Sequence, residues 1–228
     1  MLPGGPLLLS GAAMKLVILG ASGGCGAELV KQAVKRRHEV TAVVRSRSYR
    51  APEGVRVIVG ELTVETLQEA VRGQDAVLSA LGLRMPGIAP WAKPEVPNFL
   101  SLVTPRIVAA MLVEKVKRIV AISAGGVGDS YDHVPGFFKL FIKTTALRHA
   151  YAELDVMEKT LLDAPLDVCI CRPTGLTNGP ASGAVKVAEK LTGRAEIPRA
   201  DVAAWMLDAI EKPTFQYRTP MITVTGAA

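Results

Sequence analysis

Cysteine and aromatic residues are scarce in this sequence. Only 3 of its 228 residues are cysteines, and this odd, low count does not indicate a disulfide framework. A reducing, cytoplasmic location is therefore expected. Aromatic residues make up 5% of the chain, which is too few to suggest a surface for stacking bases. Nucleic acid is accordingly not an expected partner, and the net charge of +6 suits an anionic small molecule equally well.

Long apolar runs and clusters of metal-binding residues are missing as well. No apolar run reaches the roughly 20 residues that a membrane-spanning helix needs, so no membrane partner is expected. The scattered histidines His38, His133 and His149 do not have the spacing of metal ligands, and no metal is expected. Residues 1–13 lack the basic start of a signal peptide. We interpret them as a disordered extension or a remnant of expression, preceding one domain over 14–228.

Short apolar runs alternate with amphipathic segments along that domain. Strands are predicted at 15–19, 40–44, 55–59, 75–80, 116–123 and 166–171, with shorter ones within 184–189 and 222–224. Helices are predicted at 26–37, 63–72, 104–114, 145–162 and 202–211, with Thr63, Thr104 and Asp201 as N-caps. This rhythm predicts a single-domain α/β fold, a Rossmann-type doubly wound parallel sheet. Ligands of such sheets bind beyond the carboxyl ends of the strands.

A glycine-rich loop follows the first predicted strand and opens the first helix. Gly20 permits a tight turn, Gly23 lets the backbone approach a pyrophosphate, and Gly26 allows close packing of helix on strand. Helix N-termini bind phosphates through free N–H groups. The loop therefore predicts an NAD(P)-binding Rossmann domain, with a cofactor site at Gly20, Ser22, Gly23, Gly24, Cys25 and Gly26. Cys25 is either a redox-sensing thiol, since the helix dipole can lower a thiol pKa, or a small packing residue.

The end of the second strand indicates which dinucleotide is bound. NAD enzymes usually have an acidic residue there, whereas an arginine accommodates a 2′-phosphate. Here Arg45, Ser46 and Arg47 follow the strand, and no carboxylate occurs before Glu53. NADP(H) is therefore predicted to bind in preference to NAD(H). Glu61, after the third strand, is either a contact for the adenine amino group or a simple loop carboxylate.

These motifs together resemble the atypical short-chain dehydrogenase/reductase family, in particular its NmrA-like and biliverdin-IXβ (flavin) reductase branch. The likeness rests on residues 20–26, 60–61, 73–77, 81–82, 122–124, 172–173 and 199–203 with Arg45. The resemblance implies that Ser123 is a catalytic residue beside the nicotinamide. It also implies that Leu81, Gly82, Arg84, Pro173 and Thr174 flank the cofactor. The flavin reductase has a histidine where this chain has Thr174, so the resemblance leaves the substrate open.

The Tyr-x-x-x-Lys pair of most short-chain dehydrogenases is absent. The residues four positions after the four tyrosines are Glu53, Pro135, Asp155 and Met221, so alcohol oxidation or epimerisation by the usual route is not expected. We instead predict an NADPH-dependent reductase that passes a hydride to a flat conjugated small molecule such as a flavin, a quinone or a tetrapyrrole. The alternative is a non-catalytic NADP(H) sensor acting through a protein partner. The segment 137–143 is either a flap over the substrate or a surface for a protein partner or a second copy.

Overall fold

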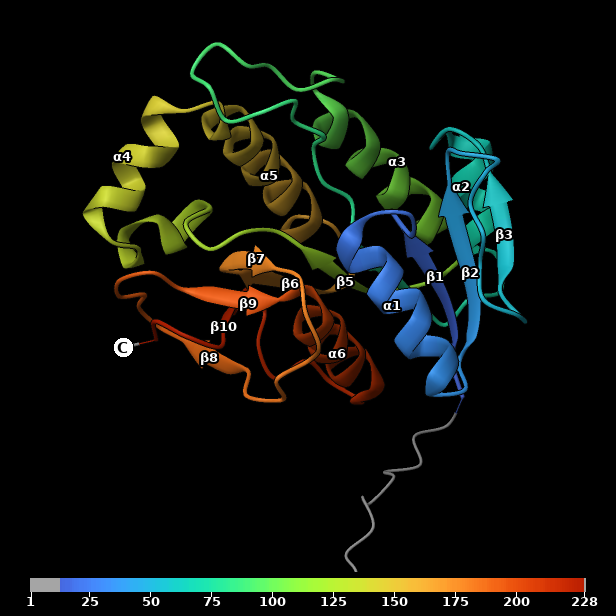
Figure 1. Ribbon diagram of the computed structural model, residues 1–228. Coiled ribbons are helices and arrows are strands. Elements are labelled where there is room, and N and C mark those ends of the chain that lie inside the picture. Colours follow the sequence, from blue (N-terminus) through green and yellow to red (C-terminus); the bar gives the residue numbers. More distant parts are fainter. Residues whose placement is uncertain (1–12, 228) are drawn as a thin grey trace, which may run out of the picture.

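The computed structural model describes residues 13–227, and the predicted extension lies outside them except for Ala13. Helices and strands alternate as predicted over most of the chain (Figure 1). In chain order they are β1 (Lys15–Leu19), α1 (Gly24–Lys35), β2 (Glu39–Val44), β3 (Arg56–Val59), α2 (Val64–Val71), β4 (Ala76–Ser79), α3 (Phe99–Val113), β5 (Arg118–Ile122), the 3-10 helix η1 (Gly128–His133), α4 (Gly136–Thr144), α5 (Leu147–Leu162), β6 (Asp167–Pro173), β7 (Gly175–Thr177), β8 (Lys186–Ala188), β9 (Glu196–Pro198), α6 (Arg199–Glu211) and β10 (Met221–Thr223).

The central sheet has 8 strands in the order β3-β2-β1-β4-β5-β6-β10-β8. All neighbours pair in parallel except β10 and β8, which are antiparallel. The chain runs outward from β1 through β2 to β3, and then returns to β4 on the other side of β1. This reversal is the topological switch point at which doubly wound folds hold ligands. The predicted Rossmann-type sheet is confirmed.

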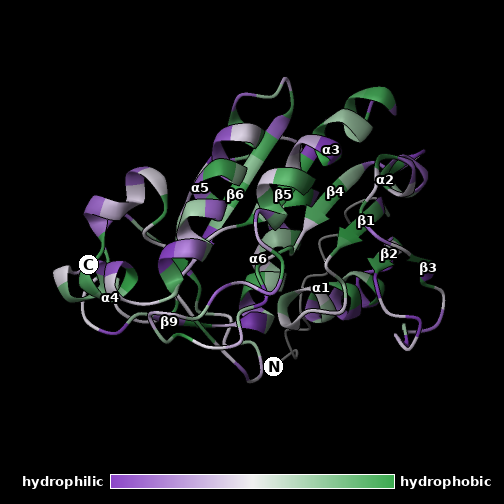
Figure 2. Ribbon diagram, turned by 90° about the horizontal axis from the view of Figure 1, so that it is seen from above, coloured by the Kyte–Doolittle hydropathy of each residue, from purple (hydrophilic) through white to green (hydrophobic). Residues whose placement is uncertain are grey.

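Successive side chains along each central strand point to opposite faces of the sheet, and each face has its own hydrophobic core. On one face, α1 and α6 cover residues such as Leu16 and Ile18, whereas α2, α3 and α5 cover Val17 and Leu19 on the other. Figure 2 shows the hydrophobic central strands between these two helical layers. Strands buried on both faces read as continuous apolar runs, which is why they were recognisable in the sequence.

Helix α3 begins five residues earlier than predicted. Its first turn is stabilised by Glu153 of α5, whose Oε2 accepts hydrogen bonds from the backbone N–H groups of Leu100 (2.9 Å) and Ser101 (3.1 Å). A carboxylate at this position satisfies donors that would otherwise lack a partner. Thr104 is therefore not the N-cap, and Pro105 lies inside the helix. The predicted start at Thr104 was wrong because the cap comes from a distant helix.

Helix α6 also starts earlier than predicted, at Arg199 after Pro198. Asp201 is not its N-cap. Its buried carboxylate instead accepts hydrogen bonds from the backbone and hydroxyl of Ser182 (2.9 and 2.7 Å) and from Gly183 N–H (3.0 Å). It thereby anchors the loop ahead of β8. Helix α4, η1 and the small parallel sheet of β7 and β9 were not predicted.

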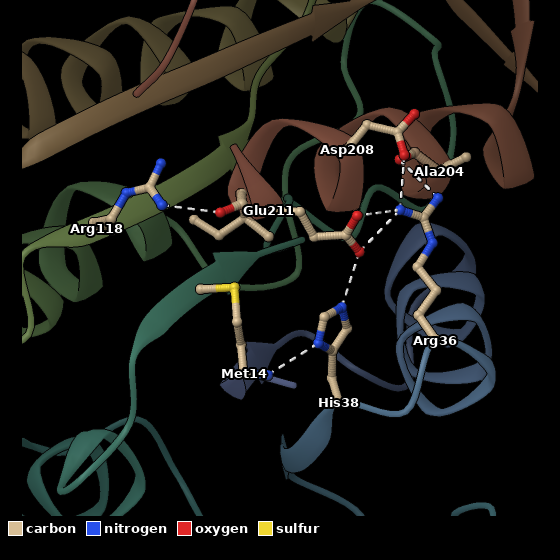
Figure 3. A network of polar contacts seen from close by, with 8 residues as sticks. Met14, Arg36, His38, Arg118, Ala204, Asp208 and Glu211 are labelled. Carbon is tan, nitrogen blue, oxygen red and sulfur yellow. Dashed lines mark hydrogen bonds and ion pairs between the residues drawn. The ribbon is translucent and has the colours of Figure 1, made fainter. Parts of the chain in front are cut away.

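Polar contacts fix the C-terminal part of α1 against α6 (Figure 3). Arg36 binds Asp208 at 2.7 Å and Glu211 at 3.0 Å. The ring of His38 contacts Glu211 Oε1 through Nε2 at 2.9 Å and accepts a hydrogen bond from Met14 N–H through Nδ1. Because α1 and α6 are held together here, the first residue of α6 comes to lie beside the glycine loop at the other end of α1.

A buried ion pair joins β6 to α5. Arg172 donates two hydrogen bonds to Glu158, from Nε at 2.9 Å and from Nη2 at 2.5 Å, and both side chains are 3% exposed. Its Nη1 also contacts Asp129 of η1 at 2.6 Å, and the Asp129 side chain is 81% exposed. The bidentate pair thus fixes α5 against the end of β6, and the Asp129 contact adds the segment that follows β5.

We predict that Glu158→Ala lowers the free energy of unfolding by about 3 kcal/mol, because it removes the principal partner of a buried guanidinium. Urea unfolding followed by circular dichroism measures this. The matched variant Asp129→Ala removes an exposed partner of the same arginine and is expected to cost less than about 1 kcal/mol. Equal losses in the two variants would contradict the assignment of the buried pair as the stabilising one.

Candidate functional site

A cleft of about 440 Å³ opens at the carboxyl ends of the central strands. It lies at the switch point between β1 and β4, where the topology places a ligand site. The predicted site residues that line it are Gly20, Ser22, Gly23, Gly24, Cys25, Arg45, Leu81, Gly82, Arg84 and Ser123. Those that do not line it are Gly26, Ser46, Arg47, Glu61, Pro173 and Thr174.

The glycine loop is shaped by two close backbone contacts. Gly20 has a φ of +76°, and a Cβ on it would lie 2.7 Å from the carbonyl oxygen of Ala80. A Cβ on Gly26 would collide with the carbonyl oxygen of Gly20. Gly26 therefore lies beneath the cleft as a packing residue, and its lack of a side chain lets α1 start directly against the end of β1.

The first turn of α1 is open to an anion. Its N-cap, Gly23, provides no side-chain hydrogen bond, and no acidic residue lies in the first turn. In α2, by contrast, the Thr63 side chain accepts a hydrogen bond from Thr66 N–H, as predicted. The N–H groups that begin α1 thus face the cleft without a side-chain cap, which is the arrangement that binds phosphates.

Arg45 reaches the cleft from the end of β2. Its guanidinium forms no ion pair within residues 13–227, and it is exposed. Ser46 turns away to hydrogen-bond Ser48 through their hydroxyls (2.7 Å), and the exposed Arg47 lies beyond it. Glu61 is exposed between Gly60 and Leu62, both of which line the cleft.

Ser123 lies at the opposite end of the cleft, directly after β5. Its backbone N–H donates to the carbonyl oxygen of Cys171 at 2.8 Å. Its side chain is buried, with the residue 6% exposed, and the Oγ has no hydrogen-bond partner within the described part of the chain. An unpaired buried hydroxyl is costly, so this atom is suited to a polar ligand group.

The other residues expected near Ser123 fall into two sets. Leu81, Gly82 and Arg84 follow β4 and line the cleft. The Arg84 side chain is 69% exposed and lies 3.8 Å from Glu95. Pro173 and Thr174 lie at the end of β6 and do not line the cleft, and the hydroxyl of Thr174 forms a hydrogen bond with that of Thr223 at 3.0 Å.

Helix α5 contributes only apolar side chains to the cleft. Ala150 and Leu154 line it and are four residues apart, the spacing of a Tyr-x-x-x-Lys pair. Neither can transfer a proton. The neighbouring Tyr151 donates its hydroxyl to the carbonyl oxygen of Gly125 (3.0 Å), and burial raises its pKa far above the ordinary value. The wall beside Ser123 thus holds no side-chain acid of the usual dehydrogenase kind.

Arg199, the first residue of α6, lines the cleft beside Gly24 and was missed by sequence reasoning. It lies far from the glycine loop in sequence, and although residues 199–203 contribute to the family resemblance, that segment does not indicate a contact with the cofactor. With Arg45 and Arg84 it gives the cleft three arginines, while no Asp or Glu among residues 13–227 lines it. The orphaned Ser123 hydroxyl, the uncapped helix and this positive charge together fit a phosphate-bearing dinucleotide.

Comparison with known families agrees with this geometry. A family model described as NAD(P)H-binding matches residues 20–213. The chain belongs to this NAD(P)H-binding family. The matched range begins at Gly20, directly after β1, and ends just after α6, so it includes every strand of the central sheet except β1 and β10.

Solved structures with the same fold include proteins named as a reductase and as a short-chain dehydrogenase/reductase, in agreement with the resemblance seen in the sequence. ChuY, an anaerobilin reductase from Escherichia coli O157:H7, matches with a TM-score of 0.75 and 22% identity over 91% of this chain and 95% of that one. A short-chain dehydrogenase/reductase from Veillonella parvula, crystallised with NADP, matches with a TM-score of 0.74 and 18% identity over 92% and 94%. The Bacillus subtilis protein YwnB is 42% identical over 69 residues, which cover 30% of this chain and 32% of YwnB.

Metal sites and membrane-spanning helices are absent from the described part of the chain. Among residues 13–227, no three His, Cys, Asp or Glu side chains come together in a group that could hold a metal ion. Over the same residues, no helix combines the length and the apolar character needed to cross a membrane.

Cys25 is predicted to be unreactive, because burial raises the pKa of its thiol to about 11 despite the opposing charge of Arg199. At pH 7.5 about one thiol in 3,000 is then a thiolate. Iodoacetamide labelling followed by peptide mass spectrometry is expected to be slow at pH 7.5 and to accelerate as the pH approaches 11. The urea-unfolded chain, in which the thiol regains an ordinary pKa, is the control. Labelling of folded Cys25 faster than a free thiol would restore the redox-sensor interpretation.

Proposed function

We propose that the protein is an NADPH-dependent reductase whose hydride acceptor is a flat conjugated molecule of the flavin, quinone or tetrapyrrole type. The observation that carries this proposal is the cleft wall formed by α5, where the lining residues Ala150 and Leu154 cannot transfer a proton. A bound nicotinamide supplies the hydride. A conjugated acceptor spreads the added electron pair over its ring system, and it takes its proton from water. Such an acceptor needs no acid from the protein.

The fold relatives support the same class of reaction. One of them is an anaerobilin reductase, and another was crystallised with NADP. The reductase activity and the bound NADP belong to those two relatives. Their identities of 22% and 18% to this chain establish the shared fold alone. The reductase proposal for this chain therefore rests on its own cleft, in which the family's dinucleotide site meets an apolar helix face.

We propose the following roles for the residues at the nicotinamide end of the cleft. Ser123 would hydrogen-bond the nicotinamide amide or the acceptor through its free Oγ. Leu81 and Gly82 after β4 would flank the nicotinamide. Pro173 and Thr174 at the end of β6 would do the same. Arg84, exposed at the rim, would balance negative charge on the acceptor.

The proposed preference for NADPH rests on Arg45. A guanidinium without an ionic partner at the end of β2 can bind a 2′-phosphate bidentately. The hydroxyl of Ser46 and the charge of Arg47 would assist, and Glu61 would accept a hydrogen bond from the adenine amino group. Among residues 13–227, no carboxylate lines this part of the cleft to bind the ribose hydroxyls of NADH instead.

Arg45→Ala is expected to weaken NADPH binding about 30-fold and to change NADH binding by less than about twofold, since only NADPH carries the 2′-phosphate. Isothermal titration calorimetry with both dinucleotides measures this. Arg50→Ala is the matched control, because Arg50 lies in the same turn, donates to backbone carbonyls and does not line the cleft. Wild-type affinities that are equal for NADPH and NADH would refute the preference.

Ser123→Ala is expected to lower kcat about 10- to 100-fold, the usual effect of one well-placed hydrogen bond near the reacting atoms. NADPH oxidation measured with FMN, FAD, quinones and biliverdins as acceptors gives the rate. The free energy of unfolding should stay unchanged, because the Oγ has no partner within the described residues and its loss breaks no hydrogen bond. Unchanged turnover, or a loss of stability that accounts for the lost activity, would contradict the role of Ser123.

One observation favours a sensor instead. Helix α4 exposes Phe137 and Leu140, which are 63% and 62% exposed, and apolar groups of this kind often mark a partner surface. Under this alternative the protein binds NADPH and acts through a protein partner or a second copy. Tight NADPH binding without oxidation by any acceptor of the panel would favour the sensor over the reductase.

A further inference from the structure

We infer that Arg199, which packs against the glycine loop, binds the diphosphate of the bound dinucleotide. This inference rests on the proposed dinucleotide function and adds to it a binding residue from the last helix. Arg199 would hold the diphosphate between its guanidinium and the first N–H groups of α1. The dinucleotide would thereby tie the small β7–β9 sheet to the central sheet.

The position of Arg199 is fixed by its contact with the glycine loop. A Cβ on Gly24 would lie 2.7 Å from the Cδ and 2.8 Å from the Nε of Arg199. The side chain therefore lies directly against the first residue of α1, and both residues line the cleft. In this fold the start of α1 is where the diphosphate binds. Arg199 stands where a diphosphate oxygen can meet both the helix and a cation.

The charge of Arg199 is held in place without being neutralised. Its Nη1 donates to the side-chain oxygen of Asn178 at 2.8 Å. Asn178 follows β7 and Arg199 follows β9, so the paired strands bring the two side chains together. No carboxylate forms an ion pair with Arg199 within residues 13–227. A guanidinium fixed by a neutral amide retains donors and a full charge for an anion.

Other groups in the cleft independently indicate a ligand. Ser123 lines the cleft, and its Oγ is buried and has no partner among the described residues. The first turn of α1 has neither a side-chain cap nor an acidic residue. The charge of Arg199 also acts on this turn, because it opposes the rise in the pKa of Cys25 that burial causes.

The three cleft arginines can be assigned to different parts of the ligand. Arg45 follows β2, at the adenosine end, and Arg84 follows β4 near the exposed rim. Only Arg199 lies against the start of α1. The diphosphate is thus the part of the dinucleotide within its reach, and the forked guanidinium suits two adjacent phosphate oxygens.

The test compares Arg199→Gln with wild type by calorimetry, using three probes. NADPH and 2′-phospho-ADP-ribose contain the diphosphate, whereas 2′-AMP lacks it. The substitution is expected to weaken the first two about 10- to 30-fold and to leave 2′-AMP within twofold. Arg199→Lys should recover part of the affinity, since it keeps the charge but not the fork. Arg194→Gln is the matched control, because Arg194 pairs with Glu196 nearby and does not line the cleft.

Several outcomes would overturn the inference. NADPH affinity unchanged in Arg199→Gln would exclude a diphosphate contact, and a raised KM for the acceptor alone would assign the arginine to the acceptor. Equal weakening of 2′-AMP would show that the substitution disturbs the adenosine end. Failure of the wild type to bind NADPH or 2′-phospho-ADP-ribose would instead refute the proposed function. The test therefore distinguishes failure of the inference about Arg199 from failure of the proposed NADPH binding.

Discussion

The structure depends on the contact between the start of α1 and the ends of β1 and β4. Gly26 packs on the carbonyl of Gly20, and Gly20 packs on that of Ala80, at distances that no side chain would allow. This approach brings an uncapped helix N-terminus to the switch point of the sheet. Every other group in the cleft is positioned relative to that turn: Arg45 by the pairing of β2 with β1, Ser123 by the pairing of β5 with β4, and Arg199 by the packing of α6 on α1.

The parts of this arrangement that were predictable are those encoded locally. Strands buried on both faces are continuous apolar runs, and the glycine loop joins the first of them to a helix. From these features the sequence predicted the parallel sheet, the cofactor class and the location of Arg45 and Ser123 near one cleft. The cap of α2 by Thr63 was also local, since donor and acceptor are three residues apart.

The remainder depends on contacts between segments distant in sequence. Helix α3 starts at Phe99 because Glu153, more than 50 residues later, satisfies its first N–H groups. Asp201 is a residue type that often caps helices, but here its carboxylate accepts hydrogen bonds from the loop at Ser182. Strands β7 and β9 have 3 residues each, too few for a periodic signal. Arg199 enters the cleft only through that small sheet and through α6, so no motif near the glycine loop reveals it.

The charges and the apolar wall of the cleft constrain the reaction together. Three arginines line the cleft and no carboxylate of residues 13–227 does, which favours an anionic ligand, whereas Ala150 and Leu154 give the reacting end no acid. An alcohol-forming reduction needs a proton at one oxygen as the hydride arrives, and these side chains cannot supply it. A conjugated acceptor does not need a proton from the protein, because its added negative charge is delocalised until water protonates the product. If the protein acts as the proposed reductase, the missing tyrosine and lysine narrow the class of acceptor, and Arg84 at the rim is the cleft cation left to stabilise the anion that forms first.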